Sequence, residues 1–180
     1  MRMPRPRPLR SRALLSALLV VSLFCPLCRQ RTEEDIILDT IDSLARLAEK
    51  QDLEAIMARF TEDFTDFEGR DKNGLRLLLS SYFDGRTGIV AHRLGHRMID
   101  IDAGRAALET EVALSSGGAE VLRRLVRVSP DIYRLRIDLA KVGEEWLIGH
   151  AEWASIGLGE LFPESLGELK KIFPLIWADR

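Results

Sequence analysis

The sequence predicts an α+β domain in which N-terminal helices pack in a strongly curved antiparallel sheet. Between residues 33 and 83, apolar side chains recur at spacings of three and four, the period of an amphipathic helix. Between residues 89 and 153, they alternate with polar side chains, as they do in strands with one buried face. In two of these strands, the apolar residues switch between odd and even positions partway along the strand. This change predicts bulges, and bulges bend a sheet.

Length and composition fit one globular domain. The chain has 180 residues, of which 46% are hydrophobic and 30% are charged. This apolar share can fill a core, which argues against disorder, and the composition is not that of a collagen, a coiled coil or a disulfide scaffold. The first 28 residues contain five arginines and no acidic residue, so the rest of the chain has a net charge of −7. We expect no nucleic-acid partner, because phosphate contacts require clustered positive charge.

Residues 1–28 have the pattern of an export signal. The five arginines precede an apolar run of 12 residues, from Ala13 to Phe24. Such a run forms about 18 Å of helix, which is short for a hydrocarbon core of about 30 Å. The pattern predicts export to a bacterial periplasm or cell envelope. A short anchor that is not cleaved is the alternative.

Both cysteines of the chain, Cys25 and Cys28, directly follow this apolar run. A cysteine in this place resembles the signal of a bacterial lipoprotein, which implies that Cys28 becomes lipidated. Leu27 departs from that pattern, since such signals usually have Gly, Ala or Ser there. The rest of the chain has no cysteine and therefore no disulfide, no thiolate metal site and no cysteine nucleophile.

Three helices are expected in the first part of the remaining chain. Thr32, Asp52 and Asp71 each precede a helical apolar pattern and can cap a helix at its N-terminus. The apolar faces are Ile37, Ile41, Leu44 and Ala48; Leu53, Ile56, Met57 and Phe60; and Leu75, Leu78, Leu79 and Tyr82. Phe64 and Phe67 are expected in an acidic loop between the second and the third helix.

Four stretches of strand follow. Ile89–Ile101 is a long strand, and residues 102–105 are a turn. The expected inward faces of the next three strands are Leu108, Thr110, Val112 and Leu114; Tyr133, Leu135, Ile137 and Leu139; and Trp146, Ile148, Ala151 and Trp153. The last set requires a bulge near Gly149 and His150. Residues 119–128 fit either a short helix or a strand.

This order of helices and strands resembles the nuclear transport factor 2-like, or SnoaL-like, superfamily, and most of all its small bacterial envelope or lipoprotein-like members. The similarity is carried by TEEDIILDTIDSLARLAEKQDLEAIMARFTEDF, EGRDKNGLRLLLSSYF and YRLRIDLAKVGEEWLIGHAEW, within a domain that we place at residues 29–156. The resemblance implies a sheet that forms a cone around the helices and leaves a conical pocket. Members include enzymes such as ketosteroid isomerase and also binding or assembly domains, so the fold does not select the function.

Residues 157–180 form an apolar C-terminal extension beyond this similarity. Its apolar residues predict a helix packed on its own domain. A lid or a partner-binding helix is the alternative.

Neither the histidines nor the acidic loop predicts a metal site. His92 and His96 would suit one metal ion on a helix, but on a strand they are about 13 Å apart, too far for a shared ion. The acidic residues between positions 62 and 71 do not recur at every second position, as the ligands of a calcium-binding loop do. We expect a solvated loop there, and no metal or cofactor.

The predicted inward strand faces contain no carboxylate that could act as a base. We therefore predict no catalytic residue, and a binding or assembly module that holds a small apolar ligand in the cone. The candidate pocket residues are Tyr133, Trp146, Trp153, Thr110 and His92. The alternative is a pocket enzyme of the ketosteroid isomerase or SnoaL-like type, with His92 as base or Tyr133 as hydrogen-bond donor. Other expected partners are the membrane, through the N-terminal lipid or signal anchor, and a second copy of the chain in a homodimer.

Charged residues on the outer strand faces predict ion pairs. Glu109 and Glu111 are expected to face outward on one strand, and Arg134 and Arg136 on the next. Opposite charges on one exposed face then pair across the strands. The alternative assigns these arginines, with those at positions 123, 124 and 127, to contact with an anionic membrane surface.

Overall fold

The computed structural model describes residues 31–116 and 131–174. Thr32–Arg180 is one compact unit, and Met1–Arg31 is another. The predicted export signal with Cys28 lies outside the described residues, and so does the ambiguous segment 119–128. None of the helices in the described ranges is long and apolar enough to cross a membrane.

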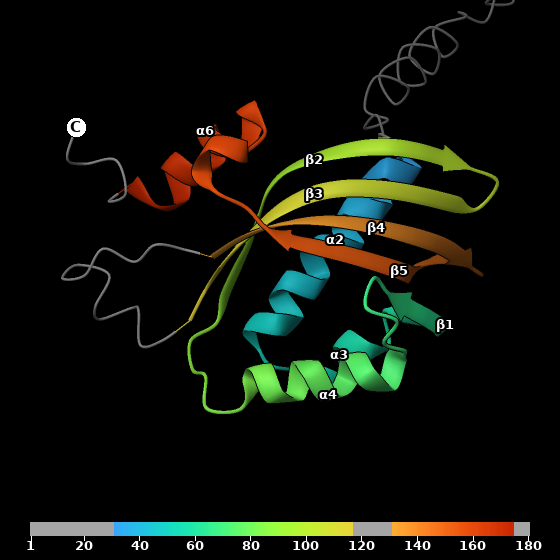
Figure 1. Ribbon diagram of the computed structural model, residues 1–180. Coiled ribbons are helices and arrows are strands. Elements are labelled where there is room, and N and C mark those ends of the chain that lie inside the picture. Colours follow the sequence, from blue (N-terminus) through green and yellow to red (C-terminus); the bar gives the residue numbers. More distant parts are fainter. Residues whose placement is uncertain (1–30, 117–130, 175–180) are drawn as a thin grey trace, which may run out of the picture. The chain divides into compact units, whose positions relative to one another are not determined.

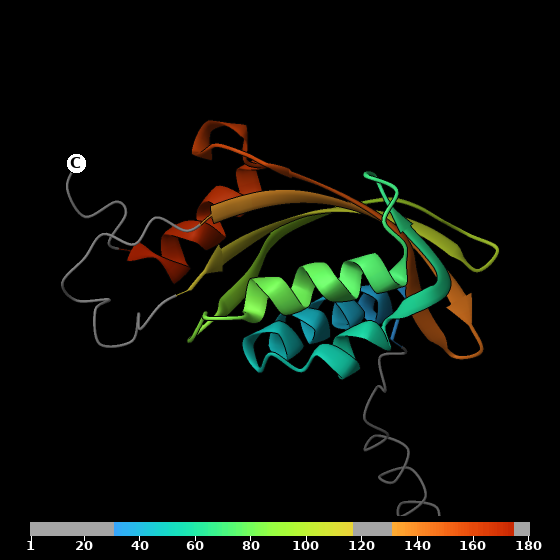
Figure 2. The same ribbon diagram turned by 60° about the horizontal axis from the view of Figure 1, so that its bottom comes forward.

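A curved sheet covers α2, which lies along its concave side (Figures 1 and 2). The elements are α2 (Glu33–Glu49), α3 (Leu53–Met57), β1 (Phe60–Asp66), α4 (Lys72–Phe83), β2 (Val90–Asp102), β3 (Arg105–Ser115), β4 (Asp131–Val142), β5 (Glu145–Ser155), the 3-10 turn η1 (Leu158–Glu160) and α6 (Pro163–Ile172). The sheet order is β1-β5-β4-β3-β2, with antiparallel pairing from β2 to β5. The predicted α+β class is confirmed.

The three predicted helix caps are present. The hydroxyl of Thr32 accepts a hydrogen bond from the backbone N–H of Asp35, whose carboxylate accepts one from Thr32 in return. The carboxylates of Asp52 and Asp71 each accept from the backbone N–H three residues further on. These bonds satisfy N–H groups that have no partner inside the helix.

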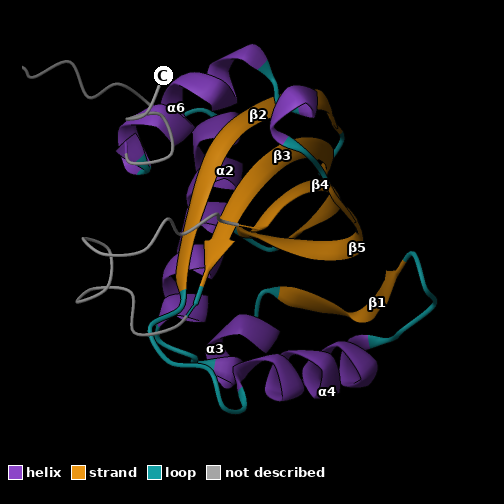
Figure 3. Ribbon diagram, turned by 60° about the vertical axis from the view of Figure 1, so that its left-hand side comes forward, coloured by secondary structure: helices purple, strands orange, loops and turns teal. Residues whose placement is uncertain are grey.

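The predicted acidic loop is wrong in its first half, because Phe60–Asp66 forms β1 (Figure 3). The second helix correspondingly ends at Met57 and does not reach Phe60. β1 pairs in parallel with β5, so the sheet is mixed and not purely antiparallel. Asp66 is buried, and its carboxylate accepts hydrogen bonds from the backbone of Glu68 and from both the backbone and the guanidinium of Arg70. The loop after β1 is therefore held by this carboxylate.

The predicted bulge in the last strand is confirmed. Asp138 of β4 is opposite His150 of β5, but the next residue, Leu139, is opposite Ile148. Gly149 is the extra residue on β5, and it brings the residues before and after it onto one face. β2 contains two similar register shifts, between Arg93 and His96 and between Met98 and Asp100. These bulges account for the strong curvature.

The main core lies between the helices and the inner face of the sheet. Its buried members are Ile37, Ile41, Ile56, Met57, Phe60, Phe64, Leu75, Ala106, Leu108, Ile137, Leu139, Trp146 and Ile148. The expected face of α4 is only partly correct, because Leu78 is 40% exposed. α4 thus presents one of its aligned leucines to solvent.

The C-terminal extension covers part of the outer face of the sheet. α6 packs beside β2 (Figure 3), and Leu169 of α6 forms a second apolar cluster with Leu94, Ala113 and Ile132. The helix approaches β2 closely at Gly95, where any Cβ atom would overlap the hydroxyl of Ser165. This extension is an integral part of the compact unit.

The packing of the C-terminal extension on the outer face changes the surroundings of the predicted ion pairs. Glu111 is directly opposite Arg134, and the guanidinium donates to its Oε1 over 2.6 Å, so the predicted cross-strand pairing is confirmed for this arginine. Arg134 also lies 3.5 Å from Glu109. The expectation that Glu111 is exposed to solvent on the outer face is wrong, however, because Glu111 is completely buried. The backbone N–H of Phe162 donates to its Oε2 over 3.0 Å, so the extension closes over this carboxylate.

Candidate functional site: the half-exposed inner face of the sheet

The inner face of the sheet changes along its strands from a packed core to a half-exposed apolar surface. On β4, Ile137 is 4% exposed, whereas the inward-facing Tyr133 is half-buried. On β3, Leu108 is 0% exposed, whereas Val112 and Leu114 are half-buried. Val112 is directly opposite Tyr133, so both changes occur at the same end of the sheet.

The same change occurs along β5. Trp146 is 2% exposed, whereas Trp153 is half-buried. The ring of Trp153 meets Phe67 edge to face, with 4.9 Å between ring centroids, and lies 5.3 Å from the guanidinium carbon of Arg70. Trp153 therefore packs against the loop after β1 and not into the main core.

α4 contributes a second wall. Tyr82 is half-buried and close enough to Tyr133 to influence the pKa of that phenol. Leu78 lies one helical turn before Tyr82, on the same side of the helix. Leu77 is 71% exposed and lies about 100° around the helix from Leu78. We define the inner patch as Leu78, Tyr82, Val112, Leu114, Tyr133 and Trp153.

The patch contains a polar group with a shifted pKa, the phenol of Tyr133. Burial raises its pKa, and so do the charge of Asp131 and the neighbouring Tyr82, whereas Arg86 lowers it. The phenol is protonated at neutral pH, as a tyrosine ordinarily is, and can donate a hydrogen bond. The sequence prediction of Tyr133 as a donor on the inner face fits this placement.

Two other predicted pocket residues belong to the core. The hydroxyl of Thr110 is buried and donates to the backbone oxygen of Gly95 over 2.7 Å. The indole N–H of Trp146 donates to Glu33 over 2.7 Å, and its ring is buried. Both polar groups are thus occupied by the protein itself.

His92 does not lie with the other candidates. It is opposite Ala113, on the outer face of the sheet, and its ring lies 6.1 Å from that of Phe173 at the C-terminal end of α6. The bulge after Arg93 separates its face from that of the next histidine, His96, which is opposite Thr110. His92 is therefore not part of the inner face, and it cannot be a base for a ligand there.

Two carboxylates of α2, Asp42 and Glu34, are paired with β2. Asp42 accepts two hydrogen bonds from the guanidinium of Arg93, over 2.6 and 2.9 Å. Glu34 lies 3.5 Å from Nε2 of His96. These contacts fix α2 to the edge strand of the sheet.

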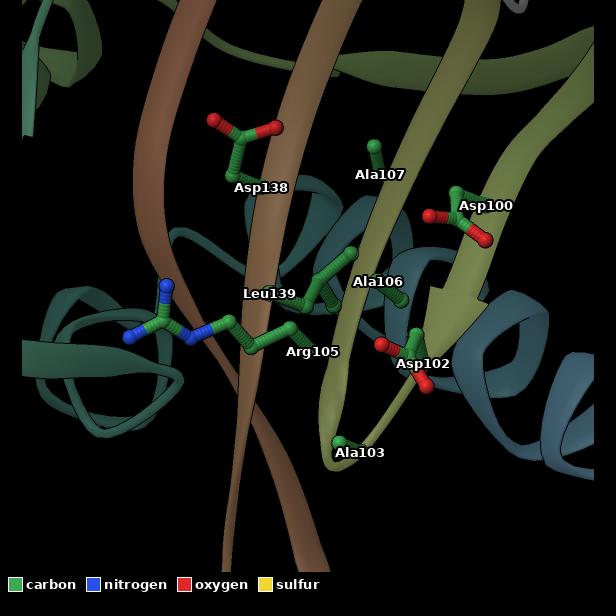
Figure 4. Close-up of a pocket in the computed structure, with 8 residues that line it drawn as sticks. All are labelled: Asp100, Asp102, Ala103, Arg105, Ala106, Ala107, Asp138 and Leu139. Atoms are coloured by element: carbon green, nitrogen blue, oxygen red, sulfur yellow. The ribbon is translucent and has the colours of Figure 1, made fainter.

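A separate hollow of about 390 Å³ lies at the turn between β2 and β3 (Figure 4). It is lined by Asp100, Asp102, Ala103, Arg105, Ala106, Ala107, Asp138 and Leu139. None of the inner-patch residues lines it. No group of three metal-ligating side chains occurs among the described residues.

Sequence comparison identifies no relative of this chain: no family model matches it, and no curated protein does. Comparison with solved structures does find similar folds. A putative scytalone dehydratase from Novosphingobium aromaticivorans matches with a TM-score of 0.58 at 14% identity, over 69% of this chain and 85% of that one. A nuclear transport factor 2-like protein of unknown function from Pseudomonas aeruginosa matches with a TM-score of 0.53 at 22% identity, over 67% and 95%.

A third match is a nuclear transport factor 2-like protein from Cytophaga hutchinsonii, with a TM-score of 0.54 at 14% identity. It covers 69% of this chain and 99% of that one. At these identities the likeness concerns the fold and not the activity. The curved sheet around α2 and these matches together show that the chain has the fold of the nuclear transport factor 2-like superfamily, as its sequence pattern predicts.

Proposed function

We propose that this domain binds a small apolar ligand at the inner patch and acts as a binding module. The observation that carries the proposal is the change from buried to half-exposed side chains along β3, β4 and β5, at one end of one concave face. Concave surfaces with apolar walls and a few polar groups are typical of small-molecule sites. Half-exposed apolar side chains on such a surface are stabilised when a ligand removes them from water.

The distribution of carboxylates favours binding over catalysis. Within β2 to β5 as described, the inner face carries no carboxylate. Asp66 at the end of β1 is buried and held by Arg70, and Asp42, which approaches from α2, is held by Arg93. A base for proton abstraction must reach the substrate directly or through one water molecule. An enzyme of the isomerase type in this patch could use Tyr133 as a donor, but within the described parts of β2 to β5 no carboxylate faces the patch to act as its base.

A neutral fluorescent probe, N-phenyl-1-naphthylamine, tests this proposal. Its fluorescence increases when it moves from water to an apolar site, so the titration of residues 32–180 gives an affinity. Leu78→Arg introduces a charge into the inner patch and should weaken binding by about tenfold or more, as expected for burying an unpaired charge. Leu77→Arg is the matched control, since its side chain is 71% exposed and lies outside the inner patch, and it should bind as the unmodified domain does.

Equal loss of binding in both variants, or no loss in either, would contradict the proposed site. Thermal unfolding of both variants shows whether they remain folded. If the domain binds no probe at all, the proposed ligand-binding function is wrong. The apolar surface would then be assigned to a protein partner.

We also propose export, which the arginines of residues 1–28 and the apolar run after them support. In a bacterial host, a reporter fused after residue 31 should reach the periplasm, and its retention in the cytosol would contradict export. Cys28→Ser should abolish labelling by a fatty-acid probe. Labelling that persists in this variant would exclude Cys28 as the lipidated residue.

A further inference from the structure

A fixed cationic residue lies beside the inner patch, in the loop after α4. The backbone N–H of Arg86 donates to the carbonyl of Phe83 over 3.1 Å, and the side-chain amide of Gln51 donates to the carbonyl of Arg86 over 2.7 Å. The guanidinium lies over the ring of Tyr82, 4.1 Å from its centroid. Backbone and side chain are thus both held in place, although the residue is exposed to solvent.

The charge of Arg86 is not neutralised by an ion pair within the described part of the chain. Other arginines near the helices are paired: Arg76 with Glu54, and Arg93 with Asp42. A guanidinium that is fixed by stacking and has no carboxylate partner can offer its N–H groups to a bound anion.

Arg86 and Tyr133 both neighbour Tyr82 of the inner patch. Arg86 follows the C-terminal end of α4, which lies on the same side of the domain as the end of β3 and the start of β4 (Figures 1 and 2). Its charge lowers the pKa of the Tyr133 phenol, against the raising effects of burial and Asp131. Arg86, stacked on Tyr82, is thus the positive charge beside this end of the patch, and Asp131 is the charge that opposes an anion there.

We propose that the ligand of the inner patch is an amphiphile with an anionic end, such as a fatty acid or an aromatic acid. Its apolar body would contact Leu78, Val112 and Leu114, and its anionic group would accept hydrogen bonds from Arg86 and from the hydroxyl of Tyr133. This inference rests on the proposed function, because it specifies the ligand of the same site. Arg86 follows the helix-ending Asp84-Gly85 pair and belongs to no sequence motif that would indicate this role.

Two fluorescent probes that differ by one anionic group separate the inference from the proposed function. 8-Anilinonaphthalene-1-sulfonate is N-phenyl-1-naphthylamine with a sulfonate. Arg86→Gln should weaken binding of the sulfonate by about tenfold, as expected for losing a charge-assisted hydrogen bond, and should change binding of the neutral probe less than twofold. Arg76→Gln is the matched control, because Arg76 is already paired with Glu54, and should leave both affinities unchanged.

Four further measurements sharpen the result. Tyr133→Phe should also weaken binding of the sulfonate, whereas Asp131→Asn should strengthen it, since it removes the opposing charge. Dodecanoate should displace the neutral probe at lower concentration than 1-dodecanol does. Added salt should reduce the difference between these two competitors.

The outcomes distinguish the two proposals. If the neutral probe binds and Arg86→Gln weakens both probes equally or neither, the patch binds apolar ligands and the anionic preference is wrong. If neither probe binds the unmodified domain, the proposed function itself is wrong. Thermal unfolding of each variant confirms that an affinity change does not reflect loss of the fold.

Discussion

The carboxylate of Glu111 is completely buried, 2.6 Å from the guanidinium of Arg134 on the neighbouring strand. The N–H of Phe162 binds its second oxygen, and the guanidinium carbon of Arg134 lies 4.8 Å from the centre of the Phe162 ring. A buried carboxylate is costly unless its partners satisfy it. The ion pair and the C-terminal extension therefore stabilise each other.

Glu111→Ala should lower the free energy of unfolding by about 3 kcal/mol, because it leaves the N–H of Phe162 without its acceptor and removes the closer of the two carboxylates paired with Arg134. Glu109→Ala is the matched control. Glu109 is on the same strand and lies 3.5 Å from the same arginine, but its side chain remains 24% exposed. It should cost about 1 kcal/mol or less. Equal urea midpoints for the two variants would show that Glu111 is not the anchor of the extension.

Gly95→Ala should displace α6 from the sheet, because the added Cβ atom would overlap the hydroxyl of Ser165. That hydroxyl is buried and has no hydrogen-bond partner within the described structure. Ser165→Ala alone should therefore be neutral or stabilising. It should also restore part of the stability lost in Gly95→Ala. Thermal unfolding of the two single variants and the double variant measures this coupling, and strictly additive effects would contradict the close approach.

The two tryptophans of β5 should differ in their contribution to stability. Trp146→Ala removes a side chain that is 2% exposed and should cost about 3–5 kcal/mol. Trp153 is on the same face but half-buried against Phe67. Trp153→Ala should cost about 1–2 kcal/mol, since mainly an edge-to-face contact and partial burial are lost. A larger cost for Trp153 would place it in the core.

Glu33 should make the stability depend on pH in the acid range. Hydrogen bonds from Lys141 and from the indole of Trp146 lower its pKa below the ordinary value of 4.5. Because the folded-state pKa is depressed, the stabilisation is present at neutral pH and disappears as the pH falls through the lowered pKa. The difference in melting temperature between the unmodified domain and Glu33→Gln should therefore be largest near neutral pH. It should decrease as the pH falls through the lowered pKa of Glu33. A difference that does not depend on pH would contradict this assignment.

The local parts of the fold could be predicted from the sequence. The caps at Thr32, Asp52 and Asp71 depend on residues three positions away, and the alternation of β3 and β4 directly gives their faces. The bulge at Gly149 was also predictable, because it alone places both tryptophans of β5 inward. β1 was missed because its exposed Glu62 and Asp63 are typical of a loop, and its parallel partner β5 lies far along the chain.

The site was only partly predictable, for a related reason. The parity conflict in β2 indicated a bulge but not its position, and the position decides that His92 lies on the outer face. The burial of Glu111 depends on residues 157–162, which lie about fifty positions further along the chain. Tyr133 and Trp153 were placed on the inner face correctly by alternation. Their half-exposure, which distinguishes them from Trp146, follows from the three-dimensional packing of the helices.

The most direct test of the central claim is to map the binding surface residue by residue. Backbone amide NMR spectra of residues 32–180, recorded during titration with N-phenyl-1-naphthylamine, would identify the residues that the ligand affects. The account predicts the largest shift changes at Leu78, Val112, Leu114 and Tyr133, and small changes at Leu94 and Ala113 on the covered outer face. Changes concentrated at the outer face, or at the hollow around Asp100 and Asp138, would contradict the assignment of the inner patch as the ligand site.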